Sequence, residues 1–172
     1  MDLHIVNYCN PLCSPMYSIT RLPEGEAYAK ARELAGHQGT SFGRFADFHN
    51  YYPRRIRTEK WLYDHFLKLG GEPASEHPLY FVLQGSDYLN EWFDKGRITR
   101  LSLNDINTKH ISFTFGDSMA KMDRVERQDP FTKEALYRMI EAHDGSVEGF
   151  MNDVIEKWHY IEAQLWVDRY CL

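Results

Sequence analysis

The chain has 172 residues, of which 43% are hydrophobic and 15% aromatic, so it can bury one sizeable core without disulfides or metals. Its formal net charge of -5 argues against broad binding of duplex nucleic acid, although a single basic groove is compatible with it. Three cysteines, no basic leader and no apolar run of about 18 residues indicate reduced thiols, a cytoplasmic location and no membrane span.

The first part of the chain is predicted to hold one strand and two helices. Residues 16–21 alternate apolar and polar side chains, as a strand does. Residues 23–36 begin with Pro and two acids and end at Gly, which indicates a helix with a narrow apolar stripe. Residues 39–53 show no clean helical period and are predicted to be loop with a short helical turn. A second helix is expected from a Thr58 cap to Leu69.

The second part is predicted to hold three short strands and one helix before a charged segment. Residues 79–83 are uninterrupted apolar and predict a strand buried on both faces. A Ser86 cap predicts a short helix through residue 93, and residues 98–103 predict another strand. Residues 110–115 alternate as a half-buried strand does. Residues 119–130 are charged and predicted to be irregular.

The C-terminal part is predicted to form two helices and a last strand. The helices start at Thr132 or Asp129 and at Ser146, and residues 160–167 alternate in strand fashion. No repeat or long linker divides the chain. We therefore expect one α+β domain over residues 1–172, with helices packed on a largely antiparallel sheet. The C-terminal strand should insert beside earlier strands, because an isolated one would be unstable.

Common catalytic and phosphate-binding motifs are absent. The chain lacks G-x-x-x-x-G-K-[ST], G-x-G-x-x-G, H-E-x-x-H, G-x-S-x-G and C-x-x-C. No two of its eight histidines lie three or four residues apart. We therefore expect neither a metal site at motif spacing nor a familiar nucleotide hydrolase, zinc protease or serine esterase.

The residues from Thr40 to Trp61, which we name the basic–aromatic stretch, concentrate positive charge and rings in an otherwise acidic chain. Guanidinium groups bind phosphate bidentately, and rings stack on planar groups. The stretch is therefore predicted to be one wall of a site for a phosphate-bearing small molecule. The alternative is a solvated face beside a helix start. The candidate ligand-binding residues are Arg44, Tyr52, Arg54, Arg55 and Arg57.

A second candidate lies on the last predicted strand. Glu162 and Gln164 are two residues apart and therefore share a face. A carboxylate and an amide placed so can hold a sugar hydroxyl and stabilise developing positive charge. The alternative is that both face water. Ser112, Thr114 and Ser118 form a third candidate, a group of small hydroxyls that ends in a Gly turn.

Four short segments resemble the ADP-ribosyltransferase fold: Ile19 to Arg21, an arginine in a loop, Ile111 to Met119, and Tyr160 to Val167. The segment with Phe113, Phe115, Ser118 and Met119 is similar to the F-Y-F…S-P-M segment of the DNA-thymidine ADP-ribosyltransferase toxins. The resemblance implies NAD as cofactor, Glu162 as the catalytic residue, and Arg44, Arg54 or Arg55 as the arginine that binds NAD. The whole chain also resembles small uncharacterised bacterial proteins, a resemblance that implies no function.

Two further hypotheses do not involve catalysis. The basic–aromatic stretch could recognise an acidic protein segment or a single strand of nucleic acid, with salt-dependent affinity. Otherwise, aromatic side chains such as Trp166 could form a homodimer contact.

Overall fold

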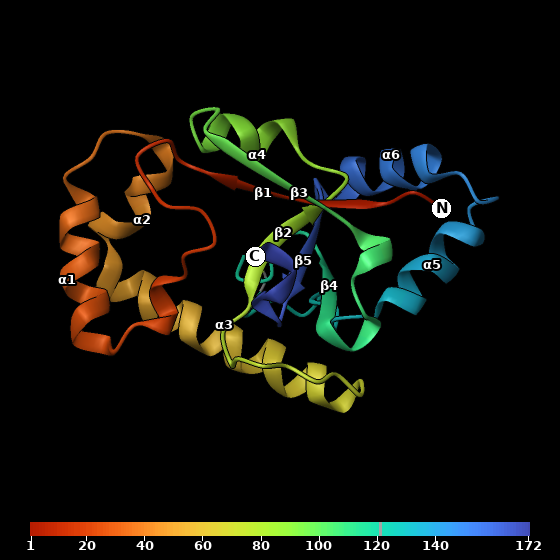
Figure 1. Cartoon of the computed structure of the whole chain (residues 1–172), viewed down its shortest axis with the longest axis horizontal. Coiled ribbons are helices and arrows are strands. Elements are labelled where there is room, and N and C mark those ends of the chain that lie inside the picture. Colours follow the sequence, from red (N-terminus) through yellow and green to blue (C-terminus); the bar gives the residue numbers. More distant parts are fainter. Residues whose placement is uncertain (121) are drawn as a thin grey trace.

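The computed structural model describes residues 1–120 and 122–172. Five strands form one sheet in the order β3-β1-β2-β5-β4, and every neighbouring pair is antiparallel. The α+β prediction is therefore confirmed, as is the insertion of the last strand, since β5 lies between β2 and β4 (Figure 1). The strands are β1 (His4–Cys9), β2 (Leu79–Leu83), β3 (Arg97–Ser102), β4 (Ile111–Phe115) and β5 (Ile161–Leu165).

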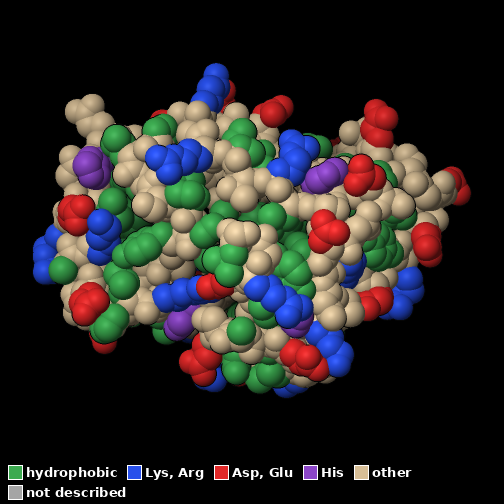
Figure 2. All heavy atoms as spheres, in the orientation of Figure 1, with side chains coloured by type: hydrophobic (Ala, Val, Ile, Leu, Met, Phe, Trp, Pro, Cys, Tyr) green, Lys and Arg blue, Asp and Glu red, His purple; other side chains and the backbone are tan. Residues whose placement is uncertain are grey.

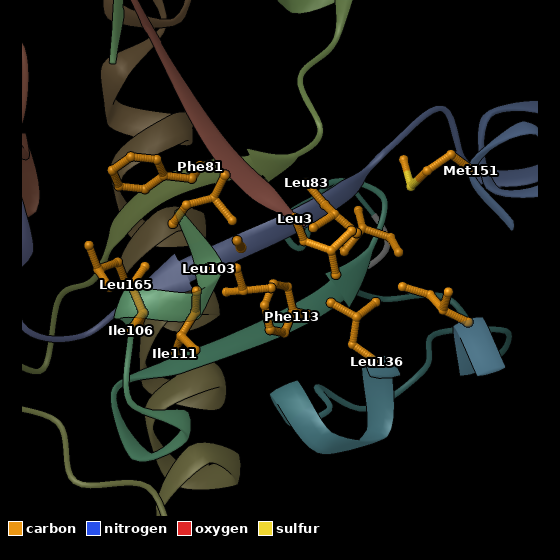
Figure 3. Close-up of a cluster of buried hydrophobic side chains, with 14 of the residues drawn as sticks. Leu3, Phe81, Leu83, Leu103, Ile106, Ile111, Phe113, Leu136, Met151 and Leu165 are labelled. Atoms are coloured by element: carbon orange, nitrogen blue, oxygen red, sulfur yellow. The ribbon is translucent and has the colours of Figure 1, made fainter. Parts of the chain in front are cut away.

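One face of the sheet packs against α5 (Lys133–Glu141) and α6 (Val147–Trp158), and the largest apolar core lies between them. Figure 3 shows side chains of the strands, such as Leu83 and Phe113, gathered with Leu136 of α5. Of the two predicted starts of α5, Thr132 is the cap and Asp129 is not, and the predicted Ser146 cap of α6 is confirmed; both side chains accept hydrogen bonds from backbone N–H groups in the first turn of their helices.

The opposite face of the sheet is partly covered by α3 (Phe48–Lys68). Leu62 and Phe66 of this helix pack on Trp166, and the Phe66 and Trp166 rings stack with centroids 5.2 Å apart. Trp166 is fully buried within its own chain. Its ring is thus covered by α3 and is not exposed for the homodimer contact considered above.

A small helical lobe stands beside the sheet (Figure 1). It consists of α1 (Glu24–Ala35), α2 (Gly43–Ala46) and the first turns of α3, which share a second apolar cluster. Aromatic rings dominate this cluster. The rings of Tyr28 and Phe48, for example, pack edge to face with centroids 4.9 Å apart. Helix α4 (Asp87–Trp92) follows β2 and is capped by Ser86 as predicted.

The structure corrects two predicted elements. Residues 16–21 are not a strand, since only Ile19–Arg21 is regular and it forms a 3-10 helix. Residues 39–53 are not loop, because they contain a 3-10 turn at Thr40–Phe42, α2 and the start of α3. Ring contacts with α1, which are distant in sequence, stabilise these helical turns despite their weak local pattern.

Helix α3 also begins ten residues earlier than the predicted Thr58 cap. Pro53 lies inside it, and the Thr58 hydroxyl donates to the Arg54 carbonyl at 2.8 Å instead of capping the helix. The arginines of the stretch are therefore not at a helix N-terminus. Residues 119–130 contain no helix or strand among the residues described there, as predicted. The remaining regular segments are 3-10 helices at Leu103–Asp105, Thr108–His110 and Asp168–Cys171.

Candidate functional site

A cavity of about 440 Å³ lies where α3 leaves the sheet uncovered, and this size is typical of small-molecule sites. Its floor is the α3-side face of β1, β2 and β5, and its walls come from the helical lobe, the segment before α1, and α4. The side chains that matter below are Arg44, Tyr51, Arg55, Glu59, Tyr80 and Glu162, all of which line it.

Two arginines form a cationic wall. The Arg55 guanidinium lies against the Tyr80 ring, 4.3 Å from its centroid, and its Nε donates to the Tyr51 hydroxyl at 3.2 Å. The Arg44 guanidinium lies 4.8 Å from the Phe45 ring centroid and is also held by ring contacts. Aromatic faces stabilise these cations without neutralising them.

Neither guanidinium forms an ion pair with a carboxylate of the described residues. Across residues 1–120 and 122–172, no carboxylate oxygen lies within 4.0 Å of a nitrogen of Arg44 or Arg55. Arg44 Nε and Arg55 Nη1 are buried and have no hydrogen-bond partner among those residues. A buried donor without a partner costs about 1–3 kcal/mol, and more when it is charged.

The cationic wall also changes the titration of neighbouring groups. Burial alone would raise the pKa of Tyr51, but the guanidinium groups of Arg55 and Arg44 outweigh it and lower that pKa below its ordinary value. Burial lowers the pKa of Arg44, because no carboxylate compensates for its lost hydration.

Glu162 is the acidic residue of the cavity floor. Its Oε1 accepts hydrogen bonds from Ser118 Oγ at 2.5 Å and Gln164 Nε2 at 2.9 Å, and its Oε2 accepts from the Ser118 backbone N–H at 3.3 Å. Burial, reinforced by the charge of Asp117, raises its pKa to about 7, against the opposing effects of Arg55 and of these hydrogen bonds. Glu162 therefore titrates near neutral pH.

A layer of hydrogen-bonded polar side chains lies behind Glu162. Gln164 Oε1 accepts from Ser112 Oγ at 2.8 Å, and Gln164 Nε2 also donates to Thr114 Oγ1 at 3.0 Å. Ser112 Oγ in turn accepts from the Trp166 indole N–H at 2.9 Å. All of these side chains are buried, so the alternative that Glu162 and Gln164 face water is wrong.

The structure separates the predicted ligand-binding residues into two groups. Arg44, Arg55 and Glu162 line one cavity. Gln164 lies one layer behind Glu162, and Tyr52 packs in the helical lobe.

The other two arginines of α3 are exposed and do not line the cavity. Arg54 Nη2 makes a 3.5 Å contact with the Met119 carbonyl, and Arg57 Nη2 lies 3.7 Å from an Asp123 oxygen. The third predicted candidate consisted of Ser112, Thr114 and Ser118. Their hydroxyl groups are hydrogen-bond partners of Gln164 and Glu162 on β5.

Of the six cavity side chains named above, three were not among the candidate residues predicted from the sequence: Tyr51, Glu59 and Tyr80. The spacing of Tyr51, Arg55 and Glu59 by four residues would place them on one helical face. That signal was obscured because the helix was predicted to begin at Thr58. Tyr80 lies in an apolar run, where no pattern indicates which face carries a ligand.

Other kinds of site find little support in the described residues. Within them, no group of three or more His, Cys, Asp or Glu side chains could hold a metal ion. Over the same residues, the helices are all too short or too polar to cross a membrane. Figure 2 shows Lys and Arg side chains dispersed among acidic ones on the viewed face, with no continuous basic patch.

Comparison with known proteins finds no matching family model, no matching curated protein and no matching solved structure. The resemblance to ADP-ribosyltransferases therefore stays a prediction.

Proposed function

We propose that the cavity binds a phosphate-bearing nucleotide of the NAD type and that Glu162 assists cleavage of its glycosidic bond. One observation carries the proposal: two half-buried arginines, each with a buried guanidinium nitrogen that has no hydrogen-bond partner and neither with a carboxylate partner, line the same cavity as a buried glutamate. Guanidinium groups suit a pyrophosphate, and the rings around them suit planar bases. The volume of about 440 Å³ is adequate for a substantial part of such a ligand.

Glu162 suits the chemistry that this ligand would undergo. When the bond from nicotinamide to ribose breaks, the electron pair leaves with nicotinamide and the ribose carbon gains oxocarbenium character. A fixed carboxylate in a buried site stabilises that charge. An acceptor hydroxyl, or water, then adds to the carbon and loses a proton. Ser118 and Gln164 hold the carboxylate in place for this role.

Isothermal titration calorimetry with pyrophosphate, ADP-ribose and NAD tests the binding step. Arg55→Ala should weaken binding about 10- to 100-fold, which corresponds to the loss of one charged hydrogen-bonding group. Arg54→Ala is the matched control, because Arg54 is the neighbouring arginine of α3 but is exposed outside the cavity. Absence of binding by the unmodified protein, or equal losses in the two variants, would refute the site.

Release of nicotinamide from NAD tests the chemical step. Glu162→Gln should abolish release while keeping binding, since the amide preserves the shape but cannot carry the charge. The rate should rise between pH 6 and pH 8, because Glu162, with a pKa of about 7, acts when ionised. Binding without any release would instead favour the hypothesis of a non-catalytic binding module.

A further inference from the structure

Glu59 lies one helical turn after Arg55 on α3, at the spacing where opposite charges commonly pair. Both side chains line the cavity. No oxygen of Glu59 is within 4.0 Å of a nitrogen of Arg55, and both residues are fully described. The nearest acid in the helix therefore leaves this arginine unpaired.

Two residues outside α3 bind the Glu59 carboxylate in place of Arg55. His77 Nδ1 lies 2.6 Å from Glu59 Oε2, and the Tyr80 hydroxyl donates to Oε1 at 3.1 Å. Both oxygens of this carboxylate, whose side chain is 1% exposed, are thus engaged. The Arg21 guanidinium donates twice to the His77 carbonyl, at 2.8 and 3.1 Å, which fixes the segment that carries His77.

We propose that Tyr80 and His77 are positioning residues that keep the Glu59 carboxylate away from Arg55, so that Arg55 stays free for an anionic ligand. The inference rests on the proposed binding of a phosphate-bearing ligand at this cavity. A carboxylate paired with Arg55 would have to be displaced before a phosphate could bind, and the lost pairing would reduce the affinity. Holding Glu59 elsewhere removes that competition in advance.

Tyr80→Phe tests the proposal, because it removes the hydroxyl but keeps the ring against Arg55. Glu59 should then turn to Arg55, and the affinity for pyrophosphate should fall roughly tenfold. The double variant Tyr80→Phe/Glu59→Gln lacks the competing charge and should regain the affinity of Glu59→Gln alone. A loss that persists in the double variant would mean that the Tyr80 hydroxyl contacts the ligand itself, which would overturn the proposal.

A second readout does not need a ligand. A crystal structure of Tyr80→Phe should show an Arg55–Glu59 ion pair within 4.0 Å, the distance at which the unmodified chain has none. Arg55 still unpaired in that variant would overturn the proposal. If pyrophosphate fails to bind the unmodified protein, the proposed function fails, and this crystal structure alone decides the role of Tyr80.

His77→Ala should act like Tyr80→Phe, and Glu59→Gln should rescue it equally. Its matched control is His143→Ala, which removes another histidine paired with a carboxylate, at 2.7 Å from Asp153 and outside the cavity lining. The control should leave the pyrophosphate affinity unchanged. An equal loss in both histidine variants would overturn the proposal.

Discussion

Glu162 is subject to opposed influences on its charge. Burial and Asp117 favour the protonated acid, while Arg55 and the hydrogen bonds from Ser118 and Gln164 favour the carboxylate. Burial dominates and raises the pKa of Glu162 from its ordinary 4.5 to about 7. The folded chain therefore holds this proton more tightly than the unfolded chain does.

This shift predicts how Glu162 makes stability depend on pH. Its contribution is fully present below about pH 4.5 and is lost as the pH rises through about 7, because ionisation is costlier in the folded state. The free energy of unfolding of the unmodified protein, relative to Glu162→Gln, should fall by about 3 kcal/mol across that range. Urea unfolding of both proteins from pH 4.5 to pH 8.5 measures the difference.

Glu156→Gln provides the control for this titration, since Glu156 is an exposed glutamate of α6. The difference in free energy of unfolding between Glu156→Gln and the unmodified protein should stay nearly constant with pH. A flat difference for Glu162→Gln as well would show that folding does not raise the pKa of Glu162.

The sequence indicated which strand face carries Glu162 more readily than which of the arginines line the cavity. A strand alternates with a period of two, so Glu162 and Gln164 share a face whatever the exact strand ends are. To distinguish Arg55, which lines the cavity, from Arg54 and Arg57, which do not, one must know which face of the helix each residue occupies. That requires knowing that α3 already includes these residues. The start of α3 is set by ring contacts with α1, which no local pattern reveals.

At the level of elements, α3 contains an internal proline. Pro53 lacks the N–H that would otherwise bond the His49 carbonyl, and its side chain is exposed, so its ring adds little packing. Pro53→Ala should raise the free energy of unfolding by about 1–2 kcal/mol, because the restored helical bond outweighs the greater freedom of the unfolded chain. Urea unfolding at fixed pH measures the change.

Pro23→Ala is the comparison for that helix variant. Pro23 occupies the N-cap position of α1, where no helical hydrogen bond is missing. Its substitution should leave stability unchanged or slightly lower it. A loss of stability in Pro53→Ala would mean instead that the fixed backbone angle of Pro53 helps α3 to form.

Elements with a strong local signal were predicted from the sequence, and those defined by distant contacts were not. The caps of α4, α5 and α6 and the alternation of β4 and β5 are local features. The helical lobe lacks such a signal, because its apolar side chains are rings that complete one cluster only when α1, α2 and α3 meet. The α+β class could therefore be predicted, whereas one wall of the cavity could not.

At the level of the whole molecule, the cavity lies between two apolar clusters of unequal size. The cluster of the sheet with α5 and α6 is much larger than that of the helical lobe. Opening the smaller cluster exposes less apolar surface and should cost less free energy than unfolding the sheet. Because Arg44 and Arg55 belong to α2 and α3, opening of the lobe would also destroy the cationic wall.

Native-state hydrogen exchange should therefore show two levels of protection. Amides of α1 and α2 should exchange through a cheaper opening than those of β2 and β5, and saturating pyrophosphate should slow exchange in the lobe. At a ligand concentration 100 times the dissociation constant, the added protection should approach ~2.7 kcal/mol, because the opened lobe cannot bind. Arg55→Ala should keep the two levels, but its weaker binding should reduce the added protection at the same ligand concentration to about 0.4–1.4 kcal/mol. If α1 and β2 amides exchange through one common opening, the lobe and the sheet unfold together and the two-level description is wrong.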